Sequence, residues 1–107
     1  MQRTIGNREQ APLILIVDDS PTQAALLEQV LFAHGYQVVG ARNGNEALQA
    51  IRARRPDLVI SDIMMPEMDG FELCRSIRGA EEMMSIPIIL LTHLNDPGHV
   101  LRSLEAG

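Results

Sequence analysis

The chain has 107 residues, of which 46% are hydrophobic and 21% are charged, and its formal net charge is -5. This length suits one small packed domain and excludes two. The acidic balance argues against direct nucleic-acid binding by this domain, because such a surface needs a basic face. The single cysteine excludes an internal disulfide, and all nine basic residues are arginine, so the sequence has no lysine.

Residues 1–12 are predicted to form an N-terminal tail, and 13–107 the folded domain. The tail is polar and has no apolar centre, so it is not a secretory signal. The longest apolar stretch, Leu13 to Val17, is far shorter than the ~20 residues of a membrane helix. We therefore expect a cytoplasmic protein with no membrane contact.

The first predicted element is a strand from Leu13 to Val17. Its residues are apolar, branched and uninterrupted, which is typical of a strand buried on both faces of a parallel sheet. A helix is predicted next, with Ser20 as its N-cap, Pro21 at its first position and Gln23 closing a capping box. The apolar stripe of this helix consists of Ala24, Leu27, Val30 and Leu31. Gly35 is expected to end the helix.

The second predicted pair is a strand from Tyr36 to Ala41 and a helix from Asn43 to about Arg54. Glu46 follows Asn43 at the spacing that is typical of a helix start. The residues of this helix that are expected to face inward are Ala47, Leu48 and Ile51. Pro56 stops the helix.

The third predicted strand runs from Leu58 to Ser61, and Asp69 and Glu72 bracket the start of the helix that follows it. The residues of this helix that are expected to pack inward are Phe71, Leu73, Cys74 and Ile77. A fourth strand is predicted from Pro87 to Leu91, and a fourth helix starts at Asp96, with an apolar stripe of Val100, Leu101 and Leu104.

The alternation of strands and helices predicts one α/β domain. Strands separated by helices form a parallel sheet with right-handed crossovers, and the helices cover both faces of that sheet. In such a sheet, ligands bind at the carboxyl ends of the strands. The residues that follow the strands are therefore the candidates for a functional site.

Acidic residues follow two of the predicted strands. Asp18 and Asp19 follow the first, and Asp62 follows the third. If these strands are neighbours, the three carboxylates converge and repel one another, unless they take up protons or a cation lies among them. Oxygen ligands of this kind suit Mg²⁺, which points to phosphoryl transfer. Thr92, after the fourth strand, would then place a hydroxyl near the product oxygens.

Aspartate after a strand is also a common helix cap. We assign that role to Asp69 and Asp96. It does not suit Asp62, because Pro66 separates it from the next helix, and Ser20 already occupies the capping position after Asp19. The functional interpretation is therefore preferred for the three carboxylates together.

Three segments, ILIVDDSP, DLVISDIMMPEMDG and IPIILLTHL, give the chain a resemblance to a known family. From Leu13 to Gly107 it resembles the receiver domain of two-component response regulators. The resemblance implies a flavodoxin-like doubly wound parallel sheet with strand order 2-1-3-4-5. Four of the five strand–helix units of that fold are present.

The resemblance also implies roles for single residues. Asp62 would accept a phosphoryl group from a phosphohistidine on a sensor histidine kinase or a histidine phosphotransfer protein. Asp18, Asp19 and Asp62 would hold Mg²⁺ together with the backbone carbonyl of Met64. Thr92 would be the switch hydroxyl, and His93 would stand at the rim of the site, where the family has a smaller residue. Such a domain is a signalling switch that dephosphorylates itself slowly, and not an enzyme in the usual sense.

The chain departs from the family at its end. The family has a lysine after a fifth strand, followed by a fifth helix, whereas this sequence has no lysine and ends in LEAG. We expect the chain to be a fragment that lacks this last unit. The alternative is a receiver that has lost the unit and whose phosphotransfer would be impaired. The apolar fourth strand would then be an exposed edge, which favours self-association.

Two alternative functions are compared with this interpretation. One is a receiver-like interaction module that works without phosphorylation, which the missing lysine favours and the retained aspartates oppose. The other is a hydrolase of the haloacid-dehalogenase type. It is disfavoured because Ser20 stands where that chemistry needs a second aspartate.

Overall fold

The computed structural model describes residues 10–65 and 67–91. The elements in chain order are β1 (Leu13–Val17), α1 (Pro21–Ala33), β2 (Gln37–Ala41), α2 (Gly44–Ala53), β3 (Leu58–Asp62), α3 (Gly70–Arg78) and β4 (Ile88–Leu91). Every predicted strand is present, with its bounds shifted by one residue at most. The predicted helix after Asp96 and most of the predicted tail lie outside the described residues.

The strands form one parallel sheet in the order β2-β1-β3-β4. This confirms the flavodoxin-like order that the sequence predicts for these four strands. Val17 of β1 pairs with Ser61 of β3, so the next residues along the two strands, Asp18 and Asp62, lie side by side. The sheet topology thus brings together residues that are distant in the sequence.

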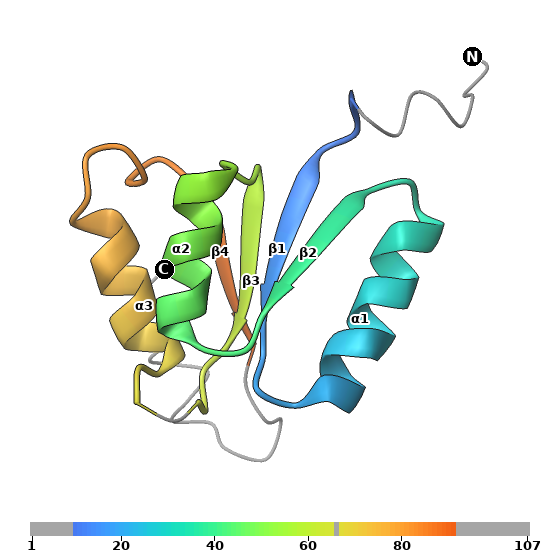
Figure 1. The fold of residues 1–107 in the computed structure, drawn as a ribbon, viewed down its shortest axis with the longest axis horizontal. Coiled ribbons are helices and arrows are strands. Elements are labelled where there is room, and N and C mark those ends of the chain that lie inside the picture. The colour runs from blue at the N-terminus through green and yellow to red at the C-terminus, as the bar shows by residue number, and fades with distance from the viewer. Residues whose placement is uncertain (1–9, 66, 92–107) are drawn as a thin grey trace.

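Helices cover both faces of the sheet (Figure 1): α1 lies on one face, and α2 and α3 lie on the other. Successive side chains of β1 point to opposite faces, so Ile14 and Ile16 join a cluster with Ile60 under α1. Leu15 and Val17 belong to a larger cluster under α2 and α3. The burial of β1 on both faces agrees with its uninterrupted apolar sequence.

The helix α1 packs less closely than its apolar stripe predicts. No residue of α1 is buried, and Val30, a member of the predicted apolar stripe, is 55% exposed. Ala24, Leu27 and Leu31 form the side that contacts the cluster around Ile14.

The capping predictions have mixed outcomes. Ser20 is the N-cap of α1 and its side chain accepts a hydrogen bond from the Gln23 N–H at 3.3 Å. The second half of the predicted capping box is wrong, because the Ser20 N–H donates to Asp18 Oδ1 at 2.8 Å. Asp69 and Glu72 form a complete capping box at the start of α3. The carboxylate of Asp18 therefore takes the hydrogen bond that Gln23 was expected to accept.

None of the helices in the described part of the chain is long and apolar enough to cross a lipid bilayer.

Candidate functional site

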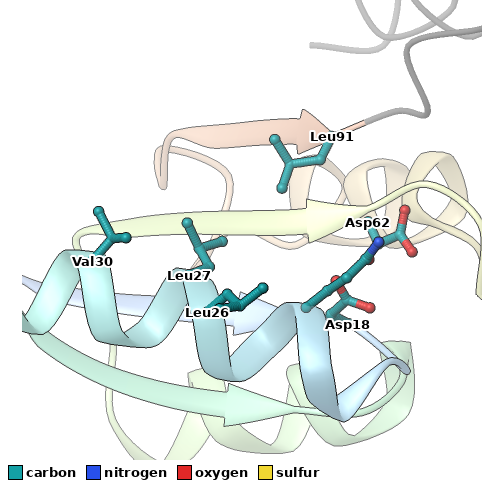
Figure 2. Close-up of a pocket in the computed structure, with 7 residues that line it drawn as sticks. Asp18, Leu26, Leu27, Val30, Asp62 and Leu91 are labelled. Carbon is teal, nitrogen blue, oxygen red and sulfur yellow. The ribbon is translucent and has the colours of Figure 1, made fainter.

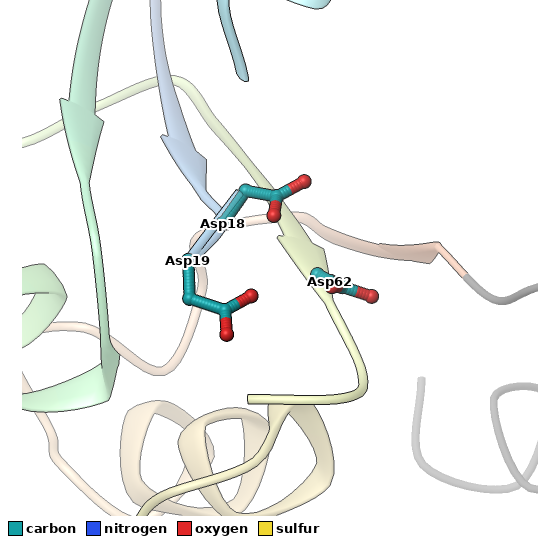
Figure 3. A group of neighbouring side chains, drawn as sticks. All are labelled: Asp18, Asp19 and Asp62. Atoms are coloured by element: carbon teal, nitrogen blue, oxygen red, sulfur yellow. The ribbon is translucent and has the colours of Figure 1, made fainter. Parts of the chain in front are cut away.

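Three carboxylates meet at the carboxyl ends of β1 and β3 (Figure 3). Asp18 and Asp19 follow the last residue of β1, and Asp62 is the last residue of β3. One carboxylate oxygen from each of the three residues lies within 4.8 Å of the other two. The tertiary structure therefore brings together the three aspartates that the sequence predicts to form a site.

Local hydrogen bonds orient two of these carboxylates. Asp18 Oδ1 accepts a hydrogen bond from the Ser20 N–H at 2.8 Å, and Asp62 Oδ1 accepts one from the Met64 N–H at 3.3 Å. In each case the donor lies two residues further along the chain, which is the pattern of an Asx-turn. Since the backbone itself holds these side chains, their direction does not depend on a bound ligand.

The three aspartates differ in their exposure to solvent. Asp18 is 7% exposed and Asp62 is 9% exposed, whereas Asp19 is an exposed residue. Two negative charges at ~4 Å repel by ~1 kcal/mol in water, and by more near the low-dielectric interior of a protein. Two nearly buried carboxylates beside a third therefore favour a cation between them.

The donor set suits a hard divalent cation. Carboxylate oxygens, few in number and open to water on one side, are the ligands that Mg²⁺ prefers in proteins. Soft metals would need cysteine or histidine, and the group contains neither. Asp18, Asp19 and Asp62 are thus chemically suited to hold Mg²⁺.

A cavity of about 430 Å³ opens beside this cluster (Figure 2). It extends from the acidic cluster along α1 toward the end of β4. Its lining residues are Asp18, Gln23, Leu26, Leu27, Val30, Asp62 and Leu91. The cavity therefore has an acidic end and an apolar wall.

The sequence analysis missed the apolar wall of this cavity. Leu26 is 60% exposed and Val30 is 55% exposed. They stand four residues apart, so on a helix their side chains are neighbours. The sequence contained a signal for this wall. Leu26 stands beside the predicted apolar stripe, and an apolar side chain there widens the stripe beyond what the sheet can cover, which indicates a second contact surface.

The remaining predicted site residues are placed only in part. Met64 lies in the loop after β3, and its side chain is 51% exposed. Thr92 and His93 lie outside the described residues. Leu91, the residue before Thr92, pairs with Asp62 in the sheet.

The sequence matches a family model, the response regulator receiver domain, over residues 14–107. The transcriptional regulatory protein AfsQ1 of Streptomyces coelicolor is 41% identical over 96 residues, which are 90% of this chain and 41% of that protein. The chain thus spans about two fifths of the length of this curated relative.

Two solved structures have the same fold. The signal receiver domain of a histidine kinase from Syntrophus aciditrophicus is 55% identical, with a TM-score of 0.82 over 91% of this chain and 74% of that one. A response regulator structure from Chloroflexus aurantiacus is 40% identical, with a TM-score of 0.87 over 91% of this chain and 80% of that one.

Proposed function

Because the chain belongs to the family of response regulator receiver domains, we propose that it is the phosphoryl-accepting switch of a two-component or phosphorelay pathway. Asp62 is the phosphoacceptor in this proposal. The observation that carries it is the meeting of Asp62 with Asp18 and Asp19 within 4.8 Å, beside an open cavity. The partner is a sensor histidine kinase or a histidine phosphotransfer protein.

The reaction is a transfer from a phosphohistidine nitrogen to a carboxylate oxygen. An oxygen of Asp62 attacks the phosphorus atom, an O–P bond forms and the N–P bond breaks. The electron pair of the broken bond returns to the imidazole nitrogen, which then takes up a proton. The product is an acyl phosphate on Asp62, so the chain is itself the acceptor and acts as a switch.

Asp18, Asp19 and Asp62 are the residues that would hold Mg²⁺, together with the backbone carbonyl of Met64. When bound, Mg²⁺ supplies positive charge opposite the phosphoryl oxygens. Asp18 contributes a carboxylate that the Ser20 N–H already orients. The Met64 N–H does the same for Asp62, which also lines the cavity.

Two further residues complete the proposed site. Thr92 provides the switch hydroxyl, and His93 stands at the rim and narrows access to Asp62. The pairing of Leu91 with Asp62 supports this assignment, because Thr92 is the next residue in the chain. The family's lysine has no counterpart in these 107 residues, and a module that works without phosphorylation is therefore the competing function.

Incubation with Mg²⁺ and a small acyl-phosphate donor separates these two functions. Intact-protein mass spectrometry of the natural full-length protein is expected to show the gain of one phosphoryl group. Asp62→Asn is expected to abolish that gain, because an amide nitrogen or oxygen is a poor nucleophile. The matched control is Asp57→Asn. Asp57 directly precedes the first residue of β3, at the end of the strand opposite Asp62, and its substitution is expected to leave the gain intact. A gain that survives Asp62→Asn, or no gain by the wild type, would contradict the proposal.

The apolar wall of the cavity is the proposed contact for the partner. Leu26, Val30 and Leu91 are all exposed and line the same cavity as Asp62. A helix that carries a phosphohistidine can lay an apolar face on such a wall while it presents the imidazole to the acidic end. The net charge of -5 supports the further proposal that this domain does not bind nucleic acid directly.

We also propose that the domain can self-associate through β4. Within the described residues, β4 pairs with β3 only. Ile89 is 47% exposed and Leu91 is 41% exposed, so this edge is apolar. An apolar strand edge with unpaired backbone groups favours pairing with a second copy.

A further inference from the structure

We propose that Gly70 is a positioning residue for Asp62, and that the missing side chain at this position sets the geometry of the acidic cluster. This inference rests on the proposed function. Gly70 is the first residue of α3 and is buried. It lies against the peptide group that joins Asp62 to Ile63.

The contact between Gly70 and this peptide group is close. The Gly70 N–H donates a hydrogen bond at 2.9 Å to the Ile63 carbonyl, which belongs to the next peptide group, and so holds the start of α3 against this segment. A Cβ atom at position 70 would lie 2.6 Å from the Asp62 carbonyl oxygen and 2.9 Å from Ile63 Cα. Both distances are shorter than those of ordinary Cβ contacts, and both involve backbone atoms. A side chain at position 70 would therefore move either α3 or the Asp62–Ile63 peptide.

The same peptide group is held from its other sides. The Ser61 hydroxyl donates to the Asp62 carbonyl at 2.9 Å, and the Ile63 N–H donates to the Leu91 carbonyl at 3.1 Å. Ser61 is fully buried, so its hydroxyl cannot exchange this bond for water without cost. The peptide is thus fixed by β4, by Ser61 and by the start of α3 together.

A shift of this peptide would change the acidic cluster. Asp62 and Met64, two of the four proposed metal ligands, lie on the segment that starts at this peptide, and the Met64 N–H bonds to the Asp62 carboxylate. Asp18 and Asp19 come from β1 and would not move with it. The spacing between the two halves of the cluster would therefore change, and both metal binding and phosphoryl acceptance depend on that spacing.

Gly79 offers a control on the same helix. It is the C-cap of α3, at the end opposite Gly70, and its φ of -85° suits any residue. A Cβ atom at position 79 would lie 3.3 Å from the Arg75 carbonyl oxygen, its nearest neighbour, so a shift of a few tenths of an ångström at the end of the helix accommodates it. Gly79→Ala is therefore expected to leave the β3–α3 loop in place.

The experiment compares Gly70→Ala with Gly79→Ala and the wild type. The rate of phosphoryl gain from a small acyl-phosphate donor is followed by mass spectrometry, and the affinity for Mg²⁺ alone is measured by calorimetry. Gly70→Ala is expected to slow the gain by about 10- to 100-fold and to weaken Mg²⁺ binding, because a displacement of the order of 1 Å has such effects. Gly79→Ala is expected to retain the wild-type rate and affinity.

Thermal unfolding without Mg²⁺ separates positioning from a structural role. If Gly70 has a purely structural role, Gly70→Ala has a lower melting temperature, but its rate of phosphoryl gain and its Mg²⁺ affinity are unchanged at temperatures where it is folded. That result would overturn the proposal. If Gly70→Ala does not fold, Ser61→Ala decides, because it releases the same carbonyl and adds no atoms. An unchanged rate in Ser61→Ala would then overturn the proposal.

The wild type shows whether the proposed function or only the role of Gly70 has failed. If the wild type gains no phosphoryl group, the proposed function itself has failed. If it does, and Gly70→Ala gains one at the same rate, only the role of Gly70 has failed.

Discussion

At the scale of single residues, the acidic cluster combines two opposing requirements. Asp18 and Asp62 are nearly buried and carry negative charges that repel each other and Asp19. The same three charges attract a divalent cation. The metal-free protein is therefore destabilised by the residues that its proposed function needs.

Asp19→Asn is expected to raise the melting temperature of the metal-free protein, because one of the three repelling charges is removed. It is also expected to reduce the stabilisation that Mg²⁺ provides, since a ligand that binds the folded state with lower affinity stabilises it less. Thermal unfolding in a chelator and in Mg²⁺ measures both effects.

Glu81→Gln is the control for this prediction. It makes the same change in net charge in the connection between α3 and β4, where the chain returns to the start of β4. It should leave the response to Mg²⁺ unchanged. A full Mg²⁺ response in Asp19→Asn would exclude Asp19 from the metal site.

At the scale of elements, α1 has two apolar sides with different tasks. Leu27 contacts the cluster of Ile14, Ile16 and Ile60 and attaches the helix to the sheet. Leu26 is 60% exposed and lines the cavity beside Asp62. Leu27 also lines the cavity, but it is partly buried against the sheet, so Leu26 is the better probe of the proposed partner contact.

Leu27→Ala is expected to lower the free energy of unfolding by about 1–2 kcal/mol, less than a fully buried leucine because Leu27 is only partly buried. Leu26→Ala should cost less than about 0.5 kcal/mol. Leu26→Ala should, however, slow phosphoryl transfer from a histidine kinase that phosphorylates the natural protein. Urea unfolding and a phosphotransfer assay measure the two effects.

A small acyl-phosphate donor provides the control, because it needs no docking surface. Leu26→Ala should accept phosphate from that donor at the wild-type rate. If its transfer from the kinase is also unchanged, α1 is not the docking surface.

At the scale of the whole molecule, β4 is expected to decide the state of association. Sedimentation velocity of this 107-residue chain over a range of concentrations should show a dimer that dissociates on dilution. Ile89→Lys should shift the protein to the monomer, because a charge on an edge strand opposes pairing with a second strand. Met84→Lys, a change at another exposed apolar side chain, serves as the control and should leave the dimer intact. A wild type that is monomeric at all concentrations and melts cooperatively would contradict this proposal.

Much of the fold could be predicted because its signals are local. The uninterrupted apolar run of Leu13–Val17 predicts a strand buried on both faces, and the structure shows this. The capping box of Asp69 and Glu72 also follows from spacing alone. Only half of the capping box predicted at Ser20 forms, because the Asp18 carboxylate, and not the Gln23 side chain, accepts the hydrogen bond of the Ser20 N–H. Spacing does not reveal which of two acceptors takes a donor.

The roles of Thr92 and His93, the loss of a fifth strand–helix unit and a cytoplasmic location stay predictions. The two residues lie outside the described part of the chain. The other two predictions concern the whole protein, and this chain spans only part of the length of its relatives.

The sequence by itself determined the order of strands and helices and the presence of acidic residues at the carboxyl ends of β1 and β3. These properties depend on apolar patterns, caps and turns within short segments. Only the tertiary structure decided that Asp18, Asp19 and Asp62 meet, that Leu26 and Val30 line a cavity, and that Gly70 lies against the Asp62–Ile63 peptide. The physical reason is that these contacts depend on the register between strands and on how closely a helix packs against a strand end. Both arise from interactions between segments that are far apart in the chain.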